Sequence, residues 1–163
     1  MKLANRQFVG EKIMFEVKNS DDYTIIKELF SEYSQIKGAE GCFASFDKEL
    51  ADLERFYKNG AILVGYEDSE PIGCIAIKKV DQKKCEAKRL FVRPEYRGKG
   101  YSRIILNAML KQGRELGYEE VVFTTKPSVM QTAYKLYKRM GFEEIRCDDG
   151  IVSMRIDLLK LEA

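Results

Sequence analysis

The alternation of hydrophobic and polar positions in the first third of the chain predicts one strand and two helices. Ile13, Phe15 and Val17 alternate with polar residues, and this period of two is typical of a half-buried strand. Between residues 25 and 36 the apolar positions recur at spacings of three and four, and the same period returns between 46 and 57. Glycine follows both periodic segments, so we expect each helix to end there.

The middle of the chain changes to short apolar runs separated by turn residues. Runs cover 61–66 and 72–80, and Asp68-Ser69-Glu70-Pro71 between them predicts a turn, so the two runs form an antiparallel hairpin. A polar turn at 81–84 leads into a third run from Cys85 to Val92. We therefore expect a meander of three strands.

Helical and strand patterns alternate over the remaining residues. Helical periodicity runs from Gly98 to Gly117, a short strand follows at 120–124, and a second helix covers 128–140. Two last strands are expected at 142–146 and 151–158. The order β-α-α-β-β-β-α-β-α-β-β is not the strict alternation of a doubly wound fold, so the sequence predicts an α/β protein with one mixed sheet flanked by helices.

Length and composition limit the classes of function. A chain of 163 residues fits a single domain over residues 1–163. The 28 Lys and Arg against 26 Asp and Glu are too evenly balanced for a protein specialised to bind nucleic acid or a membrane. Because the chain has no histidine, it lacks Ser-His-Asp and Cys-His nucleophiles and His-ligated metal sites, and we expect no metal. Acid and base chemistry then falls to Glu, Asp, Tyr, Lys or Cys.

The cysteines and the N-terminal segment favour a reducing compartment. Cys42, Cys74, Cys85 and Cys147 form no CxxC pair, so we expect four reduced thiols. The first seven residues contain no apolar signal region, and no run of 18 apolar residues occurs. We therefore expect a cytoplasmic protein.

The segment from Leu90 to Arg103 carries the most chemical information. It joins a strand to a helix through a loop with Gly98 and Gly100, and the amides at a helix N-terminus lack intrahelical acceptors. Such a loop can hold a phosphate or pyrophosphate, and Arg97, Lys99 and Arg103 add positive charge. A Walker A sequence is absent, and Arg103 stands where a Rossmann fingerprint needs its third glycine. A plain strand-to-helix turn with a basic rim is the alternative.

This segment resembles the GNAT superfamily of acetyl-CoA-dependent N-acetyltransferases. Arg97, Gly100 and Ser102 match the motif Q/R-x-x-G-x-G/A, with Ser at the last position where Gly or Ala is usual. Leu136-Tyr137-Lys138-Arg139-Met140-Gly141-Phe142 is similar to the LYxxxGF signature of the family. The resemblance covers residues 84–142, which it identifies as an acyl-CoA-binding core.

The resemblance implies a position for acetyl-CoA. The cofactor would lie between two parallel strands, 85–92 and 120–124, that are splayed apart at one end. Its pantetheine arm would pair with the backbone of Leu90, Phe91 and Val92. Its pyrophosphate would be held by the amides of the loop residues Arg97, Gly98, Lys99, Gly100, Tyr101 and Ser102. Met130 stands where many members have an Asn that contacts the cofactor, so that contact should be missing or replaced.

Tyr137 and Glu86 are the candidate catalytic residues. Tyr137 stands at the family's tyrosine position and would protonate the departing thiolate, although a core aromatic beside Tyr134 is the alternative. Glu86 would take the proton of the amine, directly or through a water, and strand parity places it on one face with Lys88 and Leu90. A solvent-facing Glu86 paired with Lys88 is the competing interpretation.

The resemblance implies transfer of acetyl to a primary amine of a small molecule or peptide, by direct attack in a ternary complex. The acceptor side would lie around Tyr33, 38–46 and 147–151, where Glu40, Glu49, Asp148 and Asp149 are acids that attract a cation, and Glu40 or Asp148 could replace Glu86 as base. We interpret Lys88-Arg89 and Arg93 as a charged, solvated edge. A homodimer through the last apolar strand at a sheet edge is a further hypothesis. A non-catalytic acyl-CoA-binding regulator and a nucleotide-binding module are the alternative functions.

Overall fold

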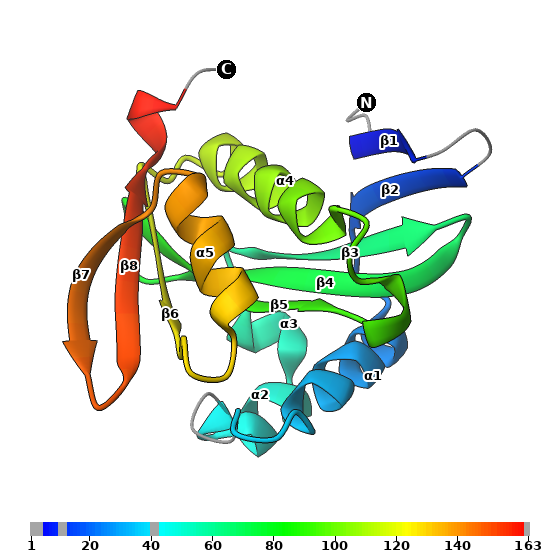
Figure 1. Cartoon of the computed structure of the whole chain (residues 1–163), viewed down its shortest axis with the longest axis horizontal. Helices are drawn as coiled ribbons and strands as arrows, with labels where there is room; N and C mark the ends of the chain where they lie inside the picture. Colours follow the sequence, from blue (N-terminus) through cyan, green and yellow to red (C-terminus); the bar gives the residue numbers. More distant parts are fainter. Residues whose placement is uncertain (1–4, 10–12, 40–42, 162–163) are drawn as a thin grey trace.

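One mixed sheet of eight strands forms the centre of the molecule (Figure 1). The computed structural model describes residues 5–9, 13–39 and 43–161. The strands are β1 (Asn5–Val9), β2 (Ile13–Asn19), β3 (Ala61–Glu67), β4 (Glu70–Lys79), β5 (Lys84–Val92), β6 (Glu120–Thr125), β7 (Glu143–Asp148) and β8 (Ile151–Asp157). The helices are α1 (Tyr23–Ser34), α2 (Phe46–Ala51), α3 (Leu53–Phe56), α4 (Tyr101–Glu115) and α5 (Gln131–Arg139). The strand order is β1-β2-β3-β4-β5-β6-β8-β7, which confirms the predicted mixed sheet with flanking helices.

Three details differ from the sequence predictions. The helix expected over 46–57 is two helices, because Asp52 has a φ of −152° and its side chain caps α3 by accepting from the amide of Arg55. The additional strand β1 pairs with β2, although its sequence shows no apolar alternation. Finally, β8 is not an edge strand, because it lies between β6 and β7.

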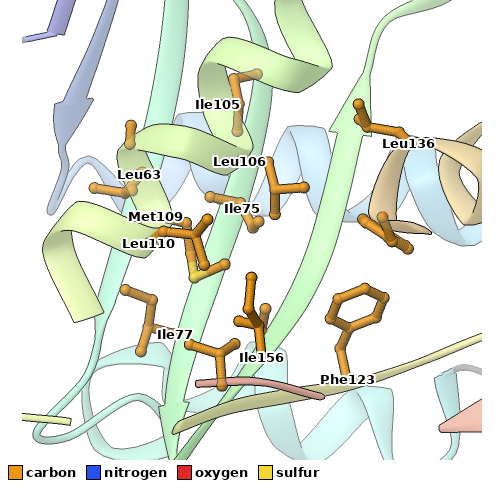
Figure 2. Close-up of a cluster of buried hydrophobic side chains, with 14 of the residues drawn as sticks. Leu63, Ile75, Ile77, Ile105, Leu106, Met109, Leu110, Phe123, Leu136 and Ile156 are labelled. Carbon is orange, nitrogen blue, oxygen red and sulfur yellow. The ribbon is translucent and has the colours of Figure 1, made fainter. Parts of the chain in front are cut away.

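The helices bury their apolar sides on both faces of the sheet. Side chains of α4 and α5 pack on one face, and those of α1 and α3 pack on the other. Figure 2 shows Ile105, Leu106 and Met109 of α4 against Ile75 and Ile77 of β4. Burying one such side chain contributes about 1.5–3 kcal/mol, so the two apolar layers stabilise the packing of the helices on the sheet.

The parallel strands β5 and β6 separate part of the way along their length. Their pairing runs from Lys84 opposite Glu120 to Glu86 opposite Val122, although β5 continues to Val92. On its other side β5 contains a bulge, because the register moves from Cys74 opposite Phe91 to Ala76 opposite Lys88. Arg89 in this bulge has a φ of +65°. The extra residue bends β5 away from β6, which confirms the expected splay.

Arg89 is buried, so the interpretation as part of a solvated edge is wrong. It is 6% exposed, and its Nε and Nη2 donate to the two carboxylate oxygens of Glu49 at 2.9 and 2.6 Å. The Tyr57 hydroxyl donates to Glu49 at 2.7 Å, and the Arg89 guanidinium lies 4.1 Å from the ring centre of Phe43. The expectation that Glu49 attracts an acceptor amine is also wrong, because Glu49 is 1% exposed and already neutralised by Arg89.

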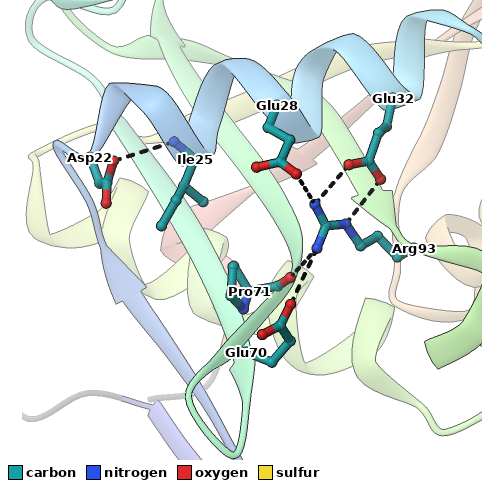
Figure 3. Close-up of polar contacts among 7 residues, drawn as sticks. All are labelled: Asp22, Ile25, Glu28, Glu32, Glu70, Pro71 and Arg93. Atoms are coloured by element: carbon teal, nitrogen blue, oxygen red, sulfur yellow. Dashed lines mark hydrogen bonds and ion pairs between the residues drawn. The ribbon is translucent and has the colours of Figure 1, made fainter.

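Arg93, at the end of the β5 segment, is also held by carboxylates (Figure 3). Its Nε and Nη2 donate to both oxygens of Glu32 at 2.9 and 2.7 Å, and Nη2 also reaches Glu28 at 3.1 Å. Its Nη1 donates to the carbonyl of Pro71 at 2.9 Å. Arg93 therefore joins α1 to the point where β5 passes into the glycine loop, and it is not a solvated cation.

The Glu49–Arg89 pair gives a stability prediction. We expect Glu49→Gln to lower the free energy of unfolding by about 3 kcal/mol, because breaking a buried ion pair leaves an uncompensated buried charge. Urea unfolding measures this change. Glu54→Gln, on the exposed side of α3, is the matched control and should change stability by less than about 0.5 kcal/mol.

A double variant separates this charge effect from lost packing. Glu49→Leu combined with Arg89→Met replaces the pair with apolar side chains and should recover most of the lost stability. If Glu49→Gln is as stable as the control, the pair does not stabilise this part of the fold.

Candidate active site

The glycine loop forms an anion-binding cradle at the N-terminus of α4. Gly98 and Gly100 have φ values of +82° and +81°, and a Cβ at either position would meet no atom within 4 Å. In the described part of the chain, the backbone amides from Gly98 to Arg103 donate to no acceptor. Because these free amides coincide with the positive end of the helix dipole, the loop suits a phosphate or pyrophosphate.

The charged side chains of the loop are fixed by neighbouring strands. Arg97 donates from Nε to the carbonyl of Val92 at 2.8 Å, which ties the loop to the end of β5. Lys99 pairs with Glu67 at 3.0 Å, and the hydroxyl of Tyr101 also donates to Glu67. Tyr101 is 1% exposed and its ring stacks on Phe15 at 3.9 Å, so its side chain is a core residue and only its backbone faces the loop.

Beyond the bulge, β5 offers a free backbone edge. Phe91 and Val92 pair with β4 on one side, and β5 has no strand partner among the described residues on its β6 side after Glu86. Leu90 packs toward the α4 face, and Phe91 packs toward the α1 face. An extended ligand can add to this edge as a strand would, with its chain running toward the glycine loop.

A cavity of about 50 Å³ lies where β5 and β6 separate. Its lining includes Glu86 and Lys88 from β5, Phe123 from β6, Tyr33 from α1 and Tyr137 from α5. The structure therefore brings the two predicted catalytic residues to one cavity, although they are far apart in the sequence.

Tyr137 belongs to the core and also lines the cavity. It is 7% exposed, and its ring lies 3.8 Å from that of Phe123 in an edge-on contact. Burial, with a smaller contribution from Tyr33, raises the pKa of the Tyr137 hydroxyl far above its usual value. The phenol is therefore neutral at every pH an assay would use, and it can donate a proton but cannot act as a base. Tyr134, one turn earlier, instead donates to Glu144.

Glu86 lies between the cavity and an open groove. The groove has a volume of about 240 Å³ and is also lined by Val122, Ile145 and Ser153. In the described residues no ion pair joins Glu86 to Lys88, so the competing interpretation of a paired surface carboxylate is not supported. The expectation that Leu90 shares a face with Glu86 is wrong, because the bulge at Arg89 reverses the alternation.

A contact between α1 and α5 was missed by the sequence analysis. The hydroxyl of Tyr33 donates to the Sδ of Met130 at 3.1 Å, and the Tyr33 ring stacks 5.5 Å from that of Phe91. Met130 thus joins the start of α5 to α1, and its side chain packs with the apolar cluster on the α1 face of the sheet. The apolar period of α1 indicated that Tyr33 is buried, but nothing in that period indicated its partner.

The other expected acids do not gather at the cavity. Asp148 is exposed in β7 and pairs with Arg146 at 2.7 Å, and Asp149 is exposed in the following turn. Glu40 lies outside the described residues. Within the described ranges there is no group of three His, Cys, Asp or Glu side chains arranged to hold a metal, and no helix long and apolar enough to cross a membrane.

Comparisons with known proteins agree with this geometry. An uncharacterized N-acetyltransferase of Schizosaccharomyces pombe is 34% identical over 131 residues, which are 78% of this chain and 80% of that protein. The structure of yncA of Salmonella typhimurium, a putative acetyltransferase solved with acetyl-CoA, has a TM-score of 0.71 at 18% identity and covers 91% of this chain and 96% of that one. The paia N-acetyltransferase of Thermoplasma acidophilum, solved with coenzyme A, has a TM-score of 0.69 at 21% identity, with coverages of 88% and 98%.

A match to a family model agrees with these similarities. The model of the acetyltransferase (GNAT) family matches residues 23–142, which include α1, the bulged strand, the glycine loop and α5. That span also contains both residues predicted to be catalytic. The chain belongs to the GNAT family and is an acyltransferase.

Proposed function

We propose that this protein transfers the acetyl group of acetyl-CoA to a primary amine by direct attack in a ternary complex. The observation that carries the proposal is the cavity where β5 and β6 separate, which Glu86 and Tyr137 line together. This cavity lies beside the free edge of β5, and that edge leads to the anion cradle of the glycine loop. A candidate acid, a candidate base and the expected binding path of the cofactor therefore meet at this cavity.

The free edge and the cradle match the parts of acetyl-CoA. The amides of the pantetheine arm would pair with Leu90, Phe91 and Val92, and the pyrophosphate would bind the amides from Arg97 to Ser102. This arrangement would direct the thioester to the splay cavity. The neighbouring structures that contain acetyl-CoA and coenzyme A support the assignment.

The cavity residues supply the two proton transfers that the reaction requires. Glu86 accepts the proton of the amine, directly or through a water, and the free nitrogen attacks the thioester carbon. The backbone amide of Leu90 is the candidate donor to the oxygen that becomes negative. When the carbon–sulfur bond breaks, the thiolate takes the proton of Tyr137, which burial keeps in its protonated form. The nitrogen then loses its second proton through water to the Tyr137 oxygen, which restores the hydroxyl, and Glu86 releases its proton to solvent. The products are an N-acetyl amine and coenzyme A.

The cradle assignment gives the first prediction for this site. Arg97→Glu should raise the Kd for acetyl-CoA at least about tenfold, because a charge-assisted hydrogen bond is worth about 1.5–3 kcal/mol and an anion would replace the cation. Calorimetric titration measures this, with ATP and NAD as competing ligands. Lys111→Glu, an equal charge change at an exposed position of α4, is the control. Equal affinity in both variants would reject the cradle.

Tyr137→Phe tests the general acid. We expect kcat to fall about 100-fold, the lower end for general acid catalysis, because a thiolate is already a fair leaving group. Because burial raises the pKa of Tyr137, the ratio of wild-type to variant kcat should stay constant from about pH 7 to pH 10. Tyr134→Phe on the same helix is the control. A fully active Tyr137→Phe enzyme would remove Tyr137 as the acid.

Glu86→Gln tests the base. The variant should lose at least about 100-fold in kcat/KM, and the rise of kcat/KM with pH should shift or disappear, because the carboxylate no longer accepts the amine proton. Rates measured across pH with a fixed acceptor amine give the profile, and Glu54→Gln is the exposed control. An unchanged profile would assign the base to another group.

A further inference from the structure

Lys88 brings a positive charge to the catalytic cavity. It is half-buried, lines the cavity with Glu86, and has no ion pair, hydrogen bond or aromatic partner in the described part of the chain. The neighbouring Arg89 is different, because Glu49 neutralises it. Among the described residues, Lys88 is thus a cation of this cavity that no carboxylate contacts directly.

The anionic groups of acetyl-CoA lie too far away to balance Lys88. A strand rises about 3.3 Å per residue and the extra residue of the bulge adds no length, so Lys88 lies about 10 Å along β5 from Val92, and the glycine loop begins farther on. The cofactor segment nearest to Lys88 in the proposed complex is the uncharged thioester end. In the proposed complex, the acceptor is therefore the ligand that can bring an anion to Lys88.

The open groove beside Glu86 favours an acceptor that also has an apolar group. Val122 and Ile145 contribute apolar surface to this groove, and Ile145 is 55% exposed. By strand alternation Glu86 and Lys88 lie on the same face of β5, opposite to Ala87, and about 6.6 Å apart along the strand. An acceptor that reaches Glu86 with its amine can therefore reach Lys88 with a second group.

We infer that the acceptor is an amino acid with an apolar side chain, whose carboxylate binds Lys88 and whose amine faces Glu86. The inference rests on the proposed function and specifies its substrate class. Lys88 is then a specificity-determining residue, because it selects an amine with an adjacent carboxylate. A protein N-terminus, which has an amide at that position, would be a poorer acceptor.

A series of matched amines tests this inference. Leucine and phenylalanine are compared with leucinamide and phenylalaninamide, and with 3-methylbutylamine and phenethylamine, which lack the carboxyl group. Rates of thiol release are measured at saturating acetyl-CoA, and mass spectrometry identifies the products. The free amino acids should have kcat/KM values at least about tenfold above those of the amides. Glycine, without the apolar side chain, should be poorer than leucine.

Variants of Lys88 distinguish a specific role from a structural one. Lys88→Met should raise KM for leucine at least about tenfold and change the constants for leucinamide far less, because only leucine loses a carboxylate contact. Lys88→Arg should retain the preference, and Lys88→Glu should reverse it. Lys83→Met, in the exposed turn before β5, is the control and should match the wild type.

Failure of the inference and failure of the proposed function give different results. Equal rates with leucine and leucinamide, or an equal loss with both in Lys88→Met, would overturn the amino acid assignment. Thiol release with peptides or diamines alone would also overturn it, while acetyl transfer itself would stand. If acetyl-CoA does not bind, or no amine releases thiol, the proposed function fails and the inference fails with it.

Discussion

A single extra residue in β5 is the constraint on which the site depends. Two regular parallel strands would stay paired along their length, but the bulge at Arg89 bends β5 away from β6 after Glu86. The separation produces both the cavity and the free backbone edge beside it. A left-handed Arg costs about 1–3 kcal/mol, so this backbone persists only because its surroundings hold it.

The bulge is held in place by α1 and α2, the helices on the α1 face of the sheet. Glu49 of α2 binds the Arg89 guanidinium at two points, and Tyr57 donates to the same carboxylate. Farther along, Arg93 binds Glu32 of α1 in the same two-point manner. Both ends of the splayed part of β5 are therefore tied to helices, and the backbone that would face a cofactor is positioned by ion pairs made on the far side of the strand.

The sequence predicts the local parts of the site better than the parts made by distant contacts. The glycine loop and the position of Tyr137 depend on short motifs, and in the structure Tyr137 and Glu86 line one cavity. The burial of Arg89 depends on Glu49, which lies 40 residues earlier in the chain. Its parity with the buried Cys85 and Ala87 points to the α4 face, but the bulge turns Arg89 to the opposite face, toward Glu49. Likewise, no local pattern indicates that Tyr33 meets Met130.

Tyr137 can be a core aromatic residue and a proton donor at the same time. The contact with Phe123 that makes Tyr137 a core residue also removes water from its hydroxyl and raises its pKa. A more exposed tyrosine would ionise more easily, but in water its proton transfer would be less well oriented. The aromatic packing around α5 thus both stabilises the fold and keeps a neutral proton donor at the edge of the cavity. A substitution in this cluster should therefore alter the pH behaviour of the reaction as well as stability, even where it leaves the hydroxyl itself intact.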